Sequence, residues 1–393
     1  MKILAIAGST IPSDTANSIQ VMKACSALAG LGHDLTLIVP QNRKSGVGSR
    51  ESDVANRQSP IINLKSEIGN LQSLYGLQTT FPVEWLKSPS RRLFTFHSVR
   101  RALKFKPDLL YVWMPQSAVF GLLADLPTIF EIHIQPSGML GPLWHRAFAR
   151  IHGRKRLACI THAMQRILRD DYRMGMSPAD VVIAPNGVDL ERFASLPTPE
   201  AARRSLGLRE APTVLCAGHL YAGRGADLFL QLAESIGDAE FVWVGGRPLD
   251  VEEWSGRAET RRLTNVAFRG FVPNVDLPNY LAAADVLLMP YARSILGSSG
   301  AADSAAVASP MKMFEYMAAG RAILTSDLPV IHEVLDETSA VFCEPENTDA
   351  WAAALKSLLS DSARRASLAQ TARRKVNEYT WLKRAEKILH GFA

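Results

Sequence analysis

Only four cysteines occur among the 393 residues of this sequence, namely Cys25, Cys159, Cys216 and Cys343. They are far apart, and none belongs to a CxxC pair. The spacing therefore excludes a small disulfide-stapled scaffold and argues against a zinc site with cysteine ligands. It suits a protein that resides in a reducing cytoplasm.

Long apolar runs are also missing. No stretch of about 18 apolar residues occurs, so a membrane-spanning helix is not expected. The N-terminal MKILAIAGS is apolar but short and leads into a polar stretch, which favours a buried strand over a signal peptide. With 47% hydrophobic and 21% charged residues, the composition is that of a soluble globular protein of two or three domains.

Acidic residues are few in the first half. Residues 1–190 contain 22 basic and 13 acidic side chains (22 − 13 = +9), whereas residues 191–393 contain 22 basic and 25 acidic ones (22 − 25 = −3). The net charge of +6 is thus concentrated in one half. This indicates an anionic partner, which leaves nucleic acid, acidic lipid and phosphorylated metabolites open; charge that serves solubility alone is the alternative.

Short runs rich in Val, Ile and Leu alternate with longer amphipathic stretches. In the first half the runs lie at 2–7, 34–39, 108–113, 128–133, 156–160 and 181–184, and an amphipathic helix is expected at 18–33. After the Pro-containing stretch 196–212, further runs lie at 213–218, 239–246, 265–271, 284–290, 321–326 and 339–344. Continuous apolar runs are typical of strands covered on both faces, so the alternation predicts two doubly wound parallel sheets. Ligands should bind beyond the carboxyl ends of the strands, and a cleft between the two domains is the default active site.

A glycine-rich loop follows the first strand of the second half. It starts at Gly218 and continues through Gly223, Arg224 and Gly225 to a helix expected from Ala226. Backbone amides at a helix start, with a guanidinium beside them, suit an anionic phosphate group. The loop matches neither a P-loop nor the GxGxxG fingerprint, so a plain strand-to-helix turn is the alternative.

The segment SPMKMFEYMAAGRAILTSD (309–327) predicts a helix. Ser309 is expected to be its N-cap, Pro310 its first residue, and Gly320 its end. Lys312 and Glu315 are neighbours on one face at this spacing. They form either an exposed ion pair, or a site where the cation faces phosphate and the carboxylate accepts hydrogen bonds from sugar hydroxyls.

A polar pair ends one apolar strand of the first half. In FEIHIQPSG (130–138), strand alternation places Glu131 and His133 on the same face. A polar pair at the carboxyl end of a strand is a catalytic candidate, although a single histidine is more often a satisfied structural residue.

Taken together, the order and spacing of these features resemble one family, the retaining GT-B glycosyltransferases of family 4. The segments that carry the resemblance are FEIH (130–133), PNGVDLERF (185–193), GHLYAGRGADLFL (218–230), NVAFRGFVPNVDLPNYLAAADVLLMPY (265–291), SPMKMFEYMAAGRAILTSDLPVIHEVL (309–335) and YTWLKRAEKIL (379–389). The chain is similar to the subgroup with the SPxKxFEYMA motif.

The resemblance implies a fold and an activity. The fold is α/β of the GT-B type, with two Rossmann-like doubly wound domains that face a cleft: an acceptor-binding domain at 1–190 and a nucleotide-sugar-binding domain at 191–375. Residues 376–393 are expected to form a helix that crosses back to the first domain. The implied reaction moves a sugar from a nucleotide-diphosphate-sugar, such as a UDP- or GDP-sugar, to a hydroxyl acceptor with retention, and needs neither a cofactor nor a metal.

Site residues follow from the matching motifs. The resemblance assigns catalysis to His133, Arg224 and Lys312. Donor binding is assigned to Gly218, His219, Arg224, Gly270, Phe271, Val272, Ser309, Lys312, Glu315 and Glu333. Arg224 would grip the diphosphate, the backbone at 270–272 would read the base, and Glu315 would bind the ribose hydroxyls.

The chain departs from the family pattern in three places. His219 stands where many members have a second arginine, and Val307 stands where many have the first glutamate of an E-x7-E motif. The first loop, GSTIPSDTANS (8–18), lacks the usual glycine pair, and Ser9, Thr10 and Asn17 are its polar candidates.

The mechanism expected from the resemblance rests on preorganised cations and amides that stabilise the leaving diphosphate, with front-face attack by the acceptor. No Asp-x-Asp motif occurs that would indicate a metal. The alternatives are a GT-B-fold sugar-nucleotide epimerase and a non-catalytic partner protein. A nucleic-acid protein is not favoured, because no recognised module accompanies the basic half.

The basic clusters bear on where the enzyme works. RRLFTFHSVRRALKFK (91–106) and HGRKR (152–156) group cations with aromatics, which suggests an anionic membrane surface or a phosphorylated acceptor. The expected location is the cytoplasm, either free or peripheral on the inner face of the cytoplasmic membrane. A lipid-linked and a soluble acceptor both remain open.

Overall fold

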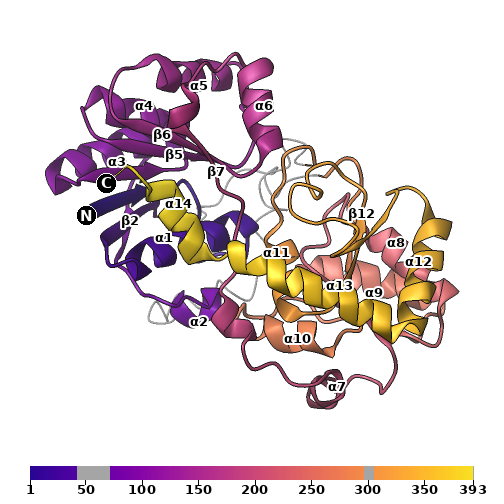
Figure 1. Ribbon diagram of the computed structural model, residues 1–393. Coiled ribbons are helices and arrows are strands. Elements are labelled where there is room, and N and C mark those ends of the chain that lie inside the picture. The colour runs from indigo at the N-terminus through magenta and orange to yellow at the C-terminus, as the bar shows by residue number, and fades with distance from the viewer. Residues whose placement is uncertain (42–70, 296–304, 393) are drawn as a thin grey trace. The chain divides into compact units, whose positions relative to one another are not determined.

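The computed structural model describes residues 1–41, 71–295 and 305–392 (Figure 1). The chain divides into two compact units. The first comprises Met1–Pro185 together with Trp381–Ala393, and the second comprises Asn186–Thr380. The chain therefore crosses between the units twice, after Pro185 and after Thr380.

The first unit is built on a seven-stranded sheet in the order β3-β2-β1-β4-β5-β6-β7, in which every neighbouring pair is parallel. Its strands are β1 Lys2–Ile6, β2 Asp34–Pro40, β3 Val83–Leu86, β4 Leu109–Val112, β5 Thr128–Ile132, β6 Lys155–Cys159 and β7 Val181–Ile183. Its helices are α1 Ala16–Gly30, α2 Leu71–Tyr75, α3 Arg91–Phe105, α4 Pro115–Leu123, α5 Gly141–Arg150, α6 His162–Asp170, the 3-10 turn η3 Pro178–Asp180 and α14 Trp381–Leu389.

The second unit is built on a six-stranded parallel sheet in the order β10-β9-β8-β11-β12-β13. Its strands are β8 Thr213–Ala217, β9 Glu240–Val244, β10 Val266–Phe268, β11 Val286–Met289, β12 Ala322–Ser326 and β13 Val341–Cys343. Its helices are α7 Pro199–Leu206, α8 Ala226–Ser235, α9 Pro248–Thr260, α10 Leu277–Ala283, α11 Met311–Ala319, α12 Thr348–Ser360, α13 Ser362–Lys375 and the 3-10 turns η4 Leu190–Phe193 and η5 Val376–Glu378.

The strand order determines where ligands can bind. In each sheet the winding direction reverses once, between β1 and β4 in the first unit and between β8 and β11 in the second. Loops that leave the carboxyl ends of two such strands diverge to opposite faces, so they leave a crevice in which ligands of doubly wound folds bind. The loops after β1, β8 and β11 are therefore the first places to look for chemistry.

The predicted alternation of strands and helices is confirmed in both units. Every apolar run singled out in the sequence contains a strand, and the central strands are fully buried because helices cover both sheet faces. The sequence analysis missed β3. This strand lies at the edge of its sheet and has the sequence VEWL, in which a charged residue interrupts the apolar run, and all four of its residues are half-buried.

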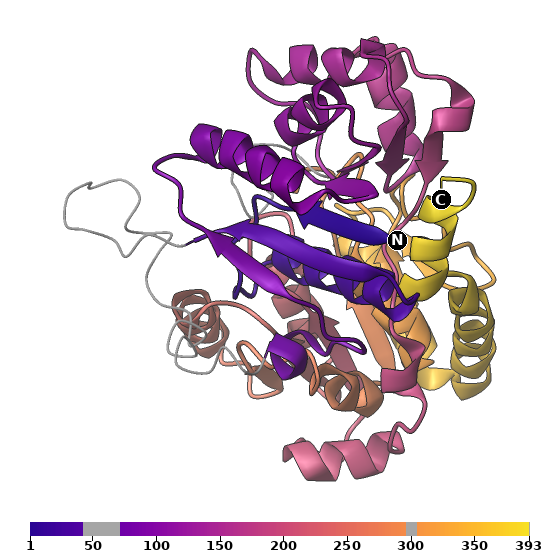
Figure 2. The same ribbon diagram turned by 90° about the vertical axis from the view of Figure 1, so that its left-hand side faces the viewer.

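The C-terminal helix α14 belongs to the first unit. It packs on α1, where a Cβ added to Gly30 would lie 3.3 Å from Leu382 Cδ2. In both Figure 1 and Figure 2 this yellow helix lies beside the indigo N-terminal elements. Just before it, Val188 N donates to Tyr379 O (2.9 Å), so the two segments that cross between the units are paired at the edge of the second unit.

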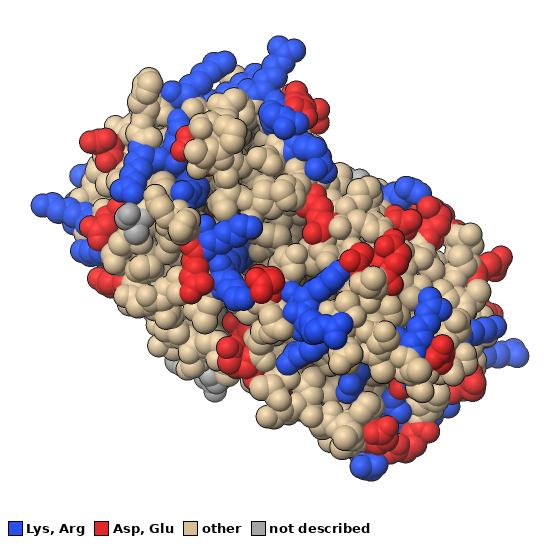
Figure 3. Space-filling model, viewed as in Figure 1, with Lys and Arg blue, Asp and Glu red and all other residues tan. Residues whose placement is uncertain are grey.

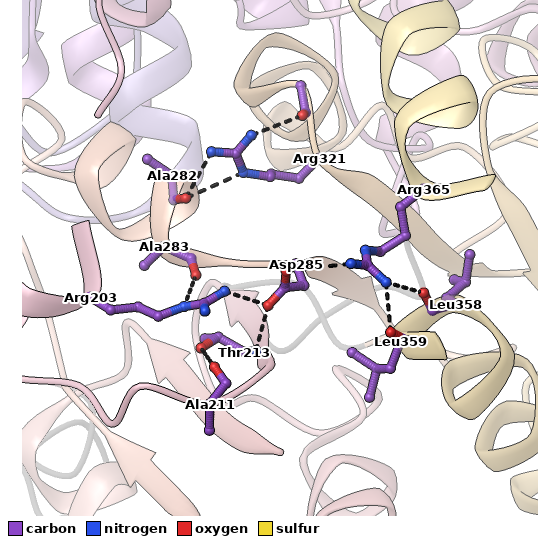
Figure 4. A network of polar contacts seen from close by, with 11 residues as sticks. Arg203, Ala211, Thr213, Ala282, Ala283, Asp285, Arg321, Leu358, Leu359 and Arg365 are labelled. Carbon is purple, nitrogen blue, oxygen red and sulfur yellow. Dashed lines mark hydrogen bonds and ion pairs between the residues drawn. The ribbon is translucent and has the colours of Figure 1, made fainter. Parts of the chain in front are cut away.

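The amino ends of the second sheet carry a structural network of charges (Figure 4). Asp285 precedes β11 and accepts hydrogen bonds from the Arg203 guanidinium and from Thr213 N. Arg365 of α13 adds an ion pair of 3.8 Å to the same carboxylate and caps helix α12 by donating to the carbonyls of Leu358 and Leu359. The network ties α7, α12 and α13 to the sheet edge opposite the loops after β8 and β11.

All four cysteines are free and buried, as their spacing predicted. Among the described residues, no helix combines the length and the apolar character that crossing a membrane requires.

Candidate active site

His133 is held in the first unit by a buried carboxylate. It directly follows β5, and its Nε2 lies 2.5 Å from Glu131 Oε1. The same-face arrangement predicted for this pair is therefore correct. The His133 side chain is 14% exposed, whereas that of Glu131 is fully buried.

Glu131 has four hydrogen-bonding neighbours, which come from α1, β4, α14 and the loop after β5. Gln20 Nε2 of α1 donates to Oε1 (2.5 Å), and the Tyr111 hydroxyl of β4 donates to Oε2. Arg384 of α14 forms an ion pair at 2.7 Å to Oε1 and 3.1 Å to Oε2. Burial raises the pKa of Glu131, but the Arg384 charge and the hydrogen bond with His133 outweigh it and hold that pKa well below its usual range.

The loop after β1 is held in place by aromatic side chains. The Tyr75 hydroxyl bonds both the amide and the carbonyl of Ser13, and Trp85 Nε1 donates to Ile11 O (2.8 Å). Of the polar candidates in this loop, Ser9 is half-buried, while Thr10 and Asn17 are exposed. They lie at the carboxyl end of β1, where the strand order reverses.

In the second unit, the glycine-rich loop after β8 packs tightly against the loop after β11. Gly223 and Gly225 have φ values of +80° and +84°. A Cβ on Gly223 would lie 2.2 Å from Ser294 O, and one on Gly225 would lie 2.1 Å from Pro290 O. These two glycines are therefore required by backbone packing at the point where the winding reverses, and this packing fixes the position of Arg224 between them.

Arg224 and Lys312 meet on one aromatic ring. The Arg224 guanidinium lies 5.1 Å from the centre of the Tyr291 ring and donates to its hydroxyl (3.1 Å), and Lys312 Nζ lies 4.6 Å from the same centre. Tyr291 follows β11 and is only 3% exposed. Two cations are thus held beside one another at the carboxyl ends of β8 and β11, an arrangement suited to a doubly charged anion.

The helix that carries Lys312 starts one residue later than expected. The N-cap of α11 is Pro310 with extended backbone (ψ 125°), so the helix begins at Met311 and the prediction of Ser309 as N-cap was wrong. The reason is that Ser309 is bonded elsewhere: its Oγ accepts from Asn186 N (3.0 Å), and its carbonyl accepts from Asn186 Nδ2 (2.6 Å). The PNGVD motif therefore anchors the start of α11. Gly320 ends the helix with a left-handed backbone, as predicted.

Glu315 pairs with an arginine distant in sequence. Its Oε1 lies 3.8 Å from an Arg192 guanidinium nitrogen and 3.5 Å from Asn274 Nδ2, and Arg192 in turn donates to Asn274 O. The side chains of Glu315 and Arg192 are 13% and 8% exposed. The alternative of an exposed Lys312–Glu315 pair is therefore not what the structure shows.

The remaining predicted donor residues surround the same strand ends. Gly218 follows β8, and a Cβ on it would lie 3.8 Å from Lys312 Nζ. The ring of His219 stacks on Tyr221 at 4.8 Å. Gly270 follows β10 with φ +67°, and its carbonyl accepts from Gly245 N (2.7 Å). Three further residues of interest are half-buried, namely Phe271, Val272 and Glu333.

Residues that contact the predicted ones but were not singled out include Tyr291, Arg192, Asn274, Asn186 and Arg384. All five lie in segments that carry the family resemblance, and Tyr291 also directly follows a strand. The partners of the other four lie far away in the chain. Among the described residues, no group of three His, Cys, Asp or Glu side chains could hold a metal ion.

Two family models match the chain in sequence order. The model described as Glycosyltransferase Family 4 matches residues 18–192, and the one described as Glycosyl transferases group 1 matches residues 211–361. The chain belongs to the family 4 glycosyltransferases. This confirms the resemblance to family 4, which rested on motifs from both halves.

Curated relatives in this family are named as sugar transferases. The D-inositol 3-phosphate glycosyltransferase of Kineococcus radiotolerans is 28% identical over 60% of this chain and 56% of its own length. The phosphatidyl-myo-inositol mannosyltransferase of Mycolicibacterium smegmatis is 27% identical over 70% of this chain and 68% of its own. The chain spans about half the length of the first relatives it matches. Their names favour neither the epimerase nor the non-catalytic alternative.

Solved structures share the fold over the full chain. Anabaena HepE in complex with UDP has a TM-score of 0.72 at 15% identity, covering 100% of this chain and 99% of that one. The likeness shows the GT-B fold of two doubly wound units, as the sequence analysis predicted.

Proposed function

We propose that this family 4 member is a retaining glycosyltransferase that moves a sugar from a nucleotide-diphosphate-sugar to a hydroxyl acceptor. The observation that carries the proposal is the pair of cations, Arg224 and Lys312, fixed on Tyr291 where the second sheet reverses its winding. A diphosphate is the ligand class that matches two adjacent cations at this position.

The chemistry follows from where charge develops. Breaking the bond between the sugar and the diphosphate leaves negative charge on the phosphate oxygens. Arg224, Lys312 and the amides at the start of α11 are held in place before the reaction, so they can stabilise that charge without reorganising. These groups would do the work that a divalent ion does in other transferases, and we propose a metal-independent reaction.

Retention is assigned to front-face attack, in which the leaving phosphate oxygen accepts the proton of the acceptor hydroxyl. His133 would orient the transferred sugar by hydrogen bonding and would not attack it. On the second unit, Glu315 would accept bonds from the ribose hydroxyls, and the backbone at Gly270 would contact the base.

For the acceptor, we propose a lipid-linked hydroxyl. The chain directly after His133 exposes apolar side chains: Ile134 (51% exposed), Met139 (89%), Leu140 (51%) and Leu143 (55%). Four exposed apolar residues within ten positions are candidates for a surface that another apolar body covers. The names of several relatives support this, because they include phosphatidylinositol mannosides and phosphatidyl-myo-inositol. The enzyme would then work at an anionic membrane surface.

The donor site is tested by binding. Arg224→Ala should weaken UDP or GDP binding by about 1.5–3 kcal/mol, the scale of a charged hydrogen bond. Arg261→Ala removes an exposed cation of the same unit and serves as the control. Isothermal calorimetry measures both, and equal affinities of Arg224→Ala and the unmodified chain would remove Arg224 from the site. Sugar transfer measured with EDTA present should persist, and its loss with recovery by Mg²⁺ would contradict the metal-free reaction.

A further inference from the structure

Arg384 is a buried cation of the C-terminal helix α14. Its side chain is 4% exposed, and it is ion-paired to Glu131, which is fully buried. Its Nε also donates to Pro185 O (2.9 Å), the last residue before the chain leaves the first unit. Burying an ion pair costs desolvation energy on both partners, and replacing it with apolar side chains of the same volume often leaves a protein equally stable. A contribution to stability is therefore a weak explanation for the presence of this pair.

The contacts of Glu131 determine the state of its carboxyl group. Oε1 is approached by Gln20, His133 and Arg384, and Oε2 by Tyr111 and Arg384. The amide of Gln20 and the guanidinium of Arg384 approach through nitrogens that can only donate. An ionised carboxylate accepts the bonds from Gln20, Tyr111 and Arg384 Nη1 and is ion-paired with Arg384 Nη2, whereas a protonated one would place a hydrogen against a donor. Glu131 is therefore an ionised carboxylate that only accepts hydrogen bonds.

Other charged or titratable groups that face Glu131 agree with this. Burial raises the pKa of the Cys25 thiol in α1, and the Glu131 charge raises it further. Burial also raises the pKa of Tyr111, which stays a neutral donor. Arg384 is the permanent cation that balances the carboxylate, and His133 is the only partner of Glu131 with a ring that can take two tautomers.

The acceptor role of Glu131 selects the tautomer of His133. Since Oε1 accepts, Nε2 of His133 must carry a hydrogen, and in the neutral ring Nδ1 is then an acceptor. Within the described part of the chain, Nδ1 makes no hydrogen bond. It is the ring atom left to interact with a hydroxyl group.

We propose that Arg384 and Glu131 form a positioning pair that holds His133 as the Nε2–H tautomer and presents its Nδ1 to a sugar hydroxyl as acceptor. This inference rests on the proposed function for the sugar. It makes the returning helix α14 a part of the reaction apparatus, because the cation that keeps Glu131 ionised comes from that helix.

The tautomer can be measured without any substrate. Long-range ¹H–¹⁵N spectra of protein labelled with [¹⁵N]histidine report the protonated ring nitrogen, and His133→Ala assigns the signal among the nine histidines. The unmodified chain should show the Nε2–H form at His133. Arg384→Gln and Glu131→Gln should shift it to a mixture or to the Nδ1–H form, while Lys387→Gln, which removes an exposed cation from the same helix, should not. An Nδ1–H form in the unmodified chain, or no change in either variant, would overturn the proposal.

Kinetics with UDP-glucose and GDP-mannose as probes separate positioning from stability. Arg384→Gln should lower kcat about 100-fold with little change in the KM of the donor, the scale expected when a catalytic group is displaced. Arg384→Lys keeps the charge and should retain kcat to within about tenfold. The double variant Glu131→Leu, Arg384→Leu removes both buried charges and should fold stably. If the pair is purely structural, this double variant should regain turnover. If the pair positions His133, the double variant should stay slow.

The two hypotheses fail in different ways. If the unmodified chain transfers no sugar from any nucleotide-sugar, the proposed function fails, and the tautomer spectra still decide whether the pair positions His133. If transfer occurs but the Arg384→Gln variant matches the unmodified chain in kcat, the positioning pair fails and the transferase assignment stands.

Discussion

At the scale of single residues, Tyr291 organises the proposed donor site without having been predicted. Its ring faces both Arg224 and Lys312, and its carbonyl accepts from Ser326 Oγ (2.6 Å), which fixes the loop after β11. Long cations lose rotamer entropy when they bind an anion. A ring that already restricts both of them reduces that loss, so the aromatic side chain contributes to affinity without touching the ligand.

Two substitutions separate the ring from its hydroxyl. Tyr291→Phe keeps the stacking but loses the bond from Arg224, and UDP or GDP affinity should fall by about 1 kcal/mol. Tyr291→Leu also removes the cation–π contacts, and the loss should reach about 2 kcal/mol. Calorimetry measures both, and Tyr280→Phe on α10 is the control. Tyr291→Leu with unaltered affinity would show that Arg224 and Lys312 need no aromatic support.

At the scale of elements, α14 depends on one buried charge pair with the first unit. Arg384 lowers the pKa of Glu131 in the folded state below its value of about 4 in the unfolded chain. A lowered pKa contributes stability above the unfolded value, and this contribution is lost as pH falls through the folded one. Without Arg384, burial is opposed only by His133, so the pKa of Glu131 rises from its lowered value and much of this contribution is lost.

The variant Arg384→Gln should therefore be most destabilised at neutral pH. At pH 7 we expect a loss of about 3 kcal/mol, because a buried carboxylate is left without its cation. At pH 4 the difference from the unmodified chain should shrink, since the variant can protonate Glu131. Urea unfolding followed by circular dichroism at both pH values tests this. A difference that stays constant or grows toward acid pH would contradict the charge assignment.

In the second unit, Asp285 connects α7, β8 and α13 at the amino ends of the strands, whereas Arg224 lies at their carboxyl ends. Asp285→Ala leaves the Arg203 guanidinium, 8% exposed, without its counter-ion, so the melting temperature should fall by several degrees, corresponding to about 3 kcal/mol. Asp227→Ala breaks an exposed pair with Arg257 and should cost less than about 1 kcal/mol. Differential scanning fluorimetry compares them. UDP binding by the folded Asp285→Ala protein should be unchanged, and a loss of affinity would place the network in the donor site.

At the scale of the whole molecule, the returning helix increases the charge asymmetry. The first unit, which includes residues 381–393, has 25 basic and 13 acidic side chains (25 − 13 = +12), and the second has 19 and 25 (19 − 25 = −6). On the face in Figure 3, Lys and Arg side chains are prominent over the first unit, and Asp and Glu lie among the cations of the second. The excess of positive charge therefore lies in the first unit.

Part of that charge is used inside the protein. In the cluster at 152–156, Lys155 Nζ donates to the carbonyls of Phe148, Ala149 and Ile151, and Arg156 donates to those of Ile388 and His390. Burial lowers the pKa of both cations. The cluster therefore secures α5 and the C-terminus, which counts against the hypothesis that it docks on lipid. The side chains of Arg91 and Arg92 lie outside the described residues, and Arg101 is paired with Glu84.

Membrane binding should instead depend on the apolar loop after His133. The double variant Met139→Glu, Leu143→Glu should bind vesicles of anionic lipid at least tenfold more weakly, because two exposed apolar anchors are lost and negative charge is added. Leu123→Glu changes an equally exposed leucine at the end of α4 and should have little effect. Vesicle sedimentation at about 0.1 M and 0.5 M salt measures binding, which should weaken with salt. Equal binding of the two variants would exclude the loop as the contact.

The sequence by itself determined the architecture and singled out most residues of the proposed donor site. Apolar runs between amphipathic stretches predicted both sheets, because a parallel strand must be apolar on both faces and a covering helix on one. Local motifs also placed Arg224 and His133 after strands and Lys312 in the first turn of a helix. The edge strand β3 was not predicted, because a half-buried strand has no continuous apolar run.

The tertiary structure alone decided which residues are partners. Ser309 is bound by Asn186, Glu315 by Arg192, and Glu131 by Arg384, with 123, 123 and 253 positions between them along the chain. A periodic pattern reports the neighbours of a residue within its own helix or strand, whereas each of these contacts forms only after distant elements of one unit have packed together. Strand periodicity was enough to predict the fold, but the state of Glu131 and His133 depends on a cation that only the folded chain brings to them.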